Sequence, residues 1–161
     1  MSPSITNGSV ELSREEGLRI IADGVPALIS YVDTEQRYQF NNEKYERWFG
    51  HSREEIRGRS IREVVGDAAY EDLRPRIEAA LAGQEVLFET WLEYRGAGSR
   101  CVEVHYVPHR DSRGMVRGFF ALVTDITEHK RTEAALRASE ERFRTAVESM
   151  TDGLGIFSSV R

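Results

Sequence analysis

Three Ser-x-x-Glu motifs, each followed by a glycine, limit how the first part of this chain can fold. In such a capping box the serine hydroxyl accepts a bond from a backbone N–H of the first helical turn, and the glutamate reaches back to the serine N–H. Glycine then ends a helix, because it adopts the left-handed backbone of a helix C-terminus. The motifs predict three short helices, and they are Ser13-Arg-Glu-Glu16, Ser52-Arg-Glu-Glu55 and Ser60-Ile-Arg-Glu63.

Two short strands and two further helices complete the first half of the chain. Residues 27–32 and 38–40 are rich in β-forming side chains and flank a polar turn, which predicts a hairpin. Asn42 is expected to cap a helix over residues 43–49. Apolar side chains three and four residues apart predict a longer helix over residues 67–81.

The second half of the domain consists of three predicted strands over residues 85–94, 100–109 and 115–124. The last segment is apolar on both faces, so we expect it near the centre of the sheet. The order strand-strand, helices, strand-strand-strand predicts an α+β domain, an antiparallel sheet with helices over one face.

A long polar helix is expected after Thr124, because no Gly or Pro occurs before Gly153. Large side chains recur every seven residues along it, which favours a coiled coil over a solvated single helix. Glu133 and Glu140 interrupt the companion position of the repeat. The repeating residues are His129, Leu136, Phe143 and Met150.

The composition of the chain limits the classes of partner that it can bind. The formal net charge of −5 gives no positive field for nucleic acid or an anionic membrane. No apolar run approaches the roughly 18 to 20 residues that span a bilayer. The single cysteine, Cys101, cannot form an internal disulfide, which fits a cytoplasmic location. A soluble part of a membrane-anchored receptor would have the same composition.

Several motifs together resemble the PAS family. They are Pro26-Ala-Leu-Ile-Ser-Tyr-Val-Asp33, Asn42 with Tyr45-Glu-Arg-Trp-Phe-Gly50, Ser52-Arg-Glu-Glu-Ile-Arg-Gly58, Val102-Glu-Val-His-Tyr106 before Pro108, and Asp125-Ile-Thr127. The resemblance implies a five-stranded antiparallel sheet of order 2-1-5-4-3, with an N-terminal helix and a long C-terminal helix. It also implies that Asp125 and Thr127 form the junction between the PAS core and its output helix.

The resemblance suggests a division of the chain. Residues 1–11 are expected to be a disordered tail, 12–24 an N-terminal helix, 25–127 the PAS domain and 128–150 a signalling helix. Residues 151–161 resemble the opening of a second PAS domain.

Side chains that surround the space between sheet and helices in a PAS fold are candidates for a ligand cavity. Aromatic groups with a polar tip suit a pocket and an ordinary core alike. Arg74 on the long helix is added because a guanidinium pairs well with a carboxylate, which makes a small organic acid one candidate ligand. The set is Tyr31, Tyr38, Trp48, Tyr70, Arg74, Trp91, Tyr106 and Phe119.

Cofactors and catalysis have little support in the sequence. Flavin-binding light sensors of the family carry an Asn-Cys-Arg motif, and residues 42–66 contain no cysteine. Haem-binding members carry a histidine on the long helix, and residues 67–81 contain none. Cys101, His105 and His109 share one strand face, but positions four apart on a strand lie roughly 13 Å apart and cannot meet around one metal ion.

The resemblance predicts a non-enzymatic sensory input module of a larger bacterial signalling protein, such as a sensor histidine kinase or a diguanylate cyclase or phosphodiesterase. The expected partners are a second copy, bound through the C-terminal or N-terminal helix, and an effector domain in the same chain. One alternative is a pure dimerisation module with a filled core. Another is a small cone-shaped α+β enzyme, which would need acid or base groups on the inner sheet face.

Overall fold

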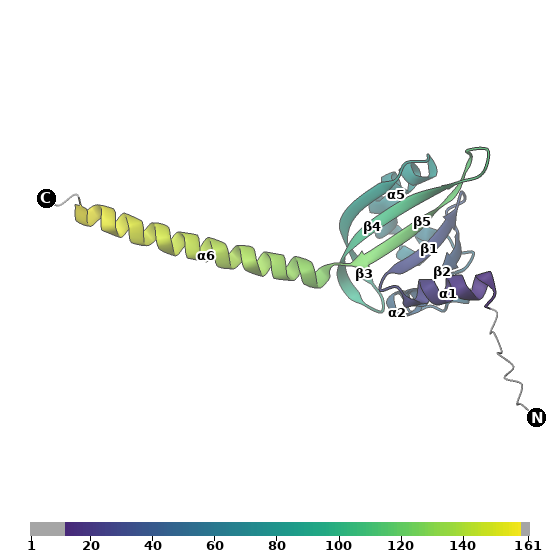
Figure 1. The fold of residues 1–161 in the computed structure, drawn as a ribbon, viewed down its shortest axis with the longest axis horizontal. Helices are drawn as coiled ribbons and strands as arrows, with labels where there is room; N and C mark the ends of the chain where they lie inside the picture. The colour runs from purple at the N-terminus through teal and green to yellow at the C-terminus, as the bar shows by residue number, and fades with distance from the viewer. Residues whose placement is uncertain (1–11, 159–161) are drawn as a thin grey trace, which may run out of the picture.

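The computed structural model describes residues 12–158, with side chains through residue 151, and it shows a curved sheet from which one long helix extends (Figure 1). The elements, in chain order, are α1 (Arg14–Gly24), β1 (Leu28–Asp33), β2 (Tyr38–Asn41), α2 (Lys44–Phe49), α3 (Arg53–Ile56), α4 (Ile61–Val65), α5 (Asp67–Leu81), β3 (Val86–Tyr94), β4 (Gly98–Arg110), β5 (Val116–Asp125) and α6 (Thr127–Ser158).

The five strands form one sheet of order β2-β1-β5-β4-β3, in which every neighbouring pair is antiparallel. This is the order that the family resemblance implies, and the central place of β5 confirms the inference from its apolar sequence. The backbone of β5 lies very close to β1 at Gly118, where a Cβ would come within 2.2 Å of the carbonyl oxygen of Val32.

All three predicted capping boxes are present. The hydroxyls of Ser13, Ser52 and Ser60 each accept a bond from the backbone N–H three residues further along the chain. The prediction that Asn42 caps α2 is wrong. The residue that precedes this helix is Glu43, whose side chain makes no capping bond, and the Asn42 amide is used elsewhere.

The core lies between the inner face of the sheet and helices α2–α5. Its apolar side chains alternate along the strands, as Val102, Val104 and Tyr106 do on β4. The opposite face of the sheet is largely open, and α1 lies against it beside β1 and β2 (Figure 1). The large apolar side chains at least one-third exposed on this outer face are Leu87, Trp91, Phe120 and Leu122.

Helix α6 begins directly after β5 and extends away from the domain (Figure 1). It continues past residue 150, where the sequence predicted the end of the signalling helix, and runs through Gly153 to Ser158. The expected tail over residues 1–11 lies outside the described residues. The assignment of residues 151–161 to a second PAS domain stays a prediction.

Candidate functional site

A cavity of about 40 Å³ lies inside the core between β1, β5 and the helices. Because a water molecule occupies roughly 30 Å³ in the liquid, this is room for one or two waters. Ligand pockets typically hold about 300 to 1,000 Å³. In this conformation the core is therefore close to filled.

Three of the eight predicted cavity residues line this space, namely Tyr38, Tyr106 and Phe119. Tyr31 and Trp91 are placed on the opposite face of the sheet. There the Tyr31 hydroxyl lies 2.8 Å from His109 Nδ1, and Trp91 is 55% exposed. The predicted inward orientation of these two side chains is therefore wrong.

Two other predicted side chains, Trp48 and Tyr70, lie near the core without lining the cavity. Trp48 packs edge-on against Tyr94, and Tyr70 donates its hydroxyl proton to Gln36. Arg74 is exposed on the outer side of α5, where its guanidinium pairs with the Glu78 carboxylate at 3.0 Å, so its prediction as a cavity residue is wrong.

The cavity also contains polar groups that the sequence reasoning missed. The Tyr45 hydroxyl donates to Ser30 Oγ at 2.8 Å, and both side chains are buried. Tyr45 and Phe49 occupy positions i and i+4 of α2 and stack at 5.3 Å between ring centroids. Residues four apart lie on the same helix face, so this spacing in the sequence could have predicted that Tyr45 and Phe49 lie together.

Burial dominates the electrostatics of these phenols. It raises the pKa of Tyr45 to about 12, although the bond to Ser30 lowers it. Burial likewise raises the pKa values of Tyr38, Tyr94 and Tyr106. The inner face thus presents neutral hydroxyl groups at physiological pH.

The three strand residues with metal-ligating side chains are engaged separately. Cys101 is buried and burial raises its thiol pKa, His105 pairs with Glu85, and His109 contacts Tyr31. Within the described part of the chain, no group of three or more His, Cys, Asp or Glu side chains is placed to hold a metal ion.

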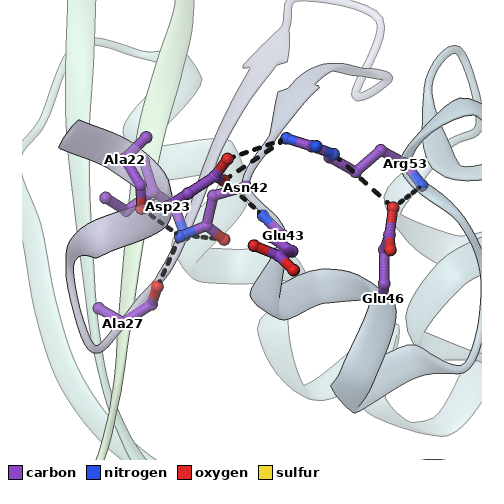
Figure 2. A network of polar contacts seen from close by, with 8 residues as sticks. Ala22, Asp23, Ala27, Asn42, Glu43, Glu46 and Arg53 are labelled. Carbon is purple, nitrogen blue, oxygen red and sulfur yellow. Dashed lines mark hydrogen bonds and ion pairs between the residues drawn. The ribbon is translucent and has the colours of Figure 1, made fainter. Parts of the chain in front are cut away.

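A polar network fixes the end of α1 to the rest of the domain (Figure 2). The fully buried Asn42 amide accepts a bond from the Ile29 N–H at 3.1 Å and donates to the carbonyls of Ala22 and Ala27, each at 2.8 Å. One side chain thus joins α1, β1 and the start of α2. These three bonds explain why an asparagine occupies position 42.

The same network continues to α3. The Asp23 carboxylate accepts a bond from the Glu43 N–H at 2.8 Å and pairs with Arg53 Nη1 at 3.3 Å. Arg53 Nε lies 3.7 Å from the Glu46 carboxylate (Figure 2). Figure 2 shows the guanidinium extending from α3 toward the end of α1.

The Asp125–Thr127 junction is bound to strand β4. The Ile126 N–H donates to the Cys101 carbonyl at 2.9 Å, and Thr127 Oγ1 accepts from the Cys101 N–H at 2.9 Å. Asp125 Oδ1 accepts bonds from the N–H and the hydroxyl of Thr127. Thr127 is buried, and these bonds continue the pairing of β5 with β4 into the first residue of α6.

Two ion pairs add to this junction. Arg100 Nη1 lies 3.5 Å from the Asp125 carboxylate, and Lys130 Nζ lies 2.8 Å from the Glu89 carboxylate on β3. The bond to Glu89 raises the pKa of Lys130. The first turn of α6 is therefore attached to β3 and β4 as well as to β5.

The PAS fold model matches residues 22–131 of the chain. The aerobic respiration control sensor protein ArcB of Escherichia coli K12 is 28% identical over 127 residues, which cover 78% of this chain and 16% of ArcB. A blue-light-activated histidine kinase of Rhizobium johnstonii is 32% identical over 100 residues, which cover 62% of this chain and 29% of the kinase. The chain thus spans less than a third of either relative.

Solved structures show the same fold. The PAS domain of a protein from Colwellia psychrerythraea superposes with a TM-score of 0.61 at 18% identity, covering 72% of this chain and 99% of that one.

The chain belongs to the PAS family, whose domains are sensory, non-catalytic modules, although some relatives of this chain are histidine kinases. None of the helices in residues 12–158 is long and apolar enough to cross a membrane.

Proposed function

We propose that this chain is the sensory and relay module of a larger bacterial signalling protein of the histidine kinase type. The observation that carries the proposal is the continuous path from the central strand β5 into α6, with the Asp125–Thr127 junction bound to β4. A shift of the sheet would reach the helix without passing through a flexible loop. Coupling of this kind requires a structural element with two arrangements, and the sites at both of its ends must shift the equilibrium between them.

The module would act as a dimer. Four large apolar side chains on α6 are between 44% and 72% exposed, and a single helix gains nothing from repeating them. Their spacing fits the seam of a parallel coiled coil with a second copy. They are Leu136, Phe143, Val147 and Met150. The exposed outer face of the sheet and α1 offer a second surface for the same contact.

A second candidate function is reception of a very small neutral ligand in the core. The cavity and its hydroxyl groups at Ser30, Tyr38 and Tyr45 favour it. Native mass spectrometry of the purified chain tests it, since a bound small molecule adds a defined mass. If the measured mass equals that of the chain alone and the chain does not respond to dissolved small ligands, the second candidate function is wrong. Only the relay function then remains.

The relay function is tested with Thr127→Ala in the full-length protein, beside Thr127→Ser, which retains the hydroxyl. Loss of the buried bonds costs about 1–3 kcal/mol of domain stability. We expect Thr127→Ala to give an output that no longer responds to the stimulus, from a domain that still melts cooperatively, and Thr127→Ser to respond normally. Normal regulation in the alanine variant would show that the junction is only a helix cap.

A further inference from the structure

A polar pocket of about 140 Å³ lies at the sheet edge between α1, β2 and α3. Three guanidinium groups and one carboxylate line it, those of Arg19, Arg53, Arg57 and Glu54. Arg53 is neutralised by Asp23 and Glu46, as described above. Arg19 and Arg57 form no ion pair within the described residues, so these two guanidinium groups can pair with an anionic ligand.

The fourth donor is a buried amide. Asn41 is 4% exposed, it lines the pocket, and its Nδ2 has no hydrogen-bond partner among the described residues. A buried donor without a partner costs about 1–3 kcal/mol. Native structures keep such a group for a reason, and a ligand that accepts the bond is one.

An apolar groove of about 550 Å³ begins at the same place and runs along the outer face of the sheet under α1. Arg19, Gln39, Phe40 and Arg57 line both spaces, so the two are continuous. The apolar side chains of the groove come from α1, β1, β2 and β5, and they include Leu18, Ile21, Ile29, Phe40 and Phe120. Its volume is that of a small-molecule site.

We propose that this continuous space binds an organic acid with an apolar tail. The carboxylate would accept bonds from the Asn41 amide and from the guanidinium groups of Arg19 and Arg57, a pairing that matches planar donors to a planar acceptor. The tail would lie in the groove against Ile21 and Phe120. The site is separate from the core cavity and stands independently of the proposed relay function.

Hexanoate, acetate and hexylammonium are suitable probes, because comparing them separates the effect of the carboxylate charge on binding from the effect of the apolar tail. Each is titrated into the isotope-labelled chain at constant ionic strength, and the Asn41 side-chain amide and the Ile21 methyl groups are followed by NMR. We expect hexanoate to shift both signals saturably and to bind about tenfold or more tightly than acetate, since each buried CH₂ adds affinity. Hexylammonium should leave the Asn41 amide unmoved.

Variants assign the contacts. Arg19→Gln and Arg57→Gln should each weaken hexanoate about tenfold or more, because each removes a charge-assisted bond. The control Arg113→Gln removes an equal charge from the exposed β4–β5 turn and should leave the affinity unchanged. Asn41→Leu should also weaken hexanoate without lowering the melting temperature, which separates lost binding from lost folding.

Three results would each overturn the proposal. The first is equal binding of hexanoate and hexylammonium. The second is a hexanoate affinity of Arg57→Gln within about a factor of two of that of the unchanged chain, where a tenfold loss is expected. The third is the absence of a saturable shift at the Asn41 amide.

Discussion

Asn42→Ala removes the side chain that joins α1, β1 and α2. The substitution breaks three hydrogen bonds, to the Ile29 N–H and to the Ala22 and Ala27 carbonyls. Each bond contributes about 1 kcal/mol net, and a backbone partner left buried without a bond costs more, so we expect a loss of about 3–5 kcal/mol. Typical domains are stable by only about 5–15 kcal/mol.

The assay is urea and thermal unfolding followed by circular dichroism. A loss of this size lowers the melting temperature of a domain of this length by about 10 °C or more. The neighbouring Asn41→Ala is the matched control, because the Asn41 amide nitrogen has no hydrogen-bond partner within the described residues. It should cost at most about 1 kcal/mol. Equal losses in the two variants would refute the assignment of these bonds to Asn42.

Three further predictions concern other parts of the molecule. Light scattering should show self-association of the full chain that is reduced in a version ending at Thr127 and in Phe143→Glu, whereas monomers in every case would contradict the coiled-coil seam. The free energy of unfolding should fall as the pH rises above about 10, the unfolded phenol pKa, because the folded state holds the protons of buried phenols such as Tyr45 more tightly. Phenolate absorbance that reaches the amplitude of all 6 tyrosines before any loss of secondary structure would contradict that burial. The purified protein should be colourless, because residues 42–66 carry no cysteine for a flavin and residues 67–81 carry no histidine for a haem, and a Soret band or flavin absorption would refute this.

Local signals predicted most of the fold. The serine and glutamate of each capping box act within one helical turn, so the sequence alone was enough to place α1, α3 and α4. The uniformly apolar β5 indicated a central strand. However, its outer-face residue Phe120 is 43% exposed, because a groove separates it from α1 on the outer face of the sheet.

The candidate site was harder to predict, because the face of a strand residue depends on register. A bulge between Tyr31 and Val32 shifts the pairing of β1 with β2, and Trp91 lies opposite Cys101 on the outer face. Neither fact can be read from a single strand. Arg74 was predictable, since Glu71 and Glu78 lie three and four residues away on α5 and mark an exposed, ion-paired face.

The function of Asn42 was missed for a different reason. An asparagine before a helix is a common cap, and local sequence gives no sign of partners 13 to 20 residues away. Only the folded arrangement brings the Ile29 N–H and the Ala22 carbonyl to the same amide. A residue that acts through such long-range hydrogen bonds therefore cannot be recognised from a short sequence motif.

The central claim, that α6 relays a change from the sheet, is tested most directly by inserting one to seven residues after Arg137 in the full-length protein and measuring the output. Each inserted residue rotates the distal helix by about 100°, and a seven-residue insertion restores the coiled-coil register. We predict an output that varies with insertion length and a normal response to the stimulus when seven residues are added. An output that is the same at every length would contradict transmission through the helix.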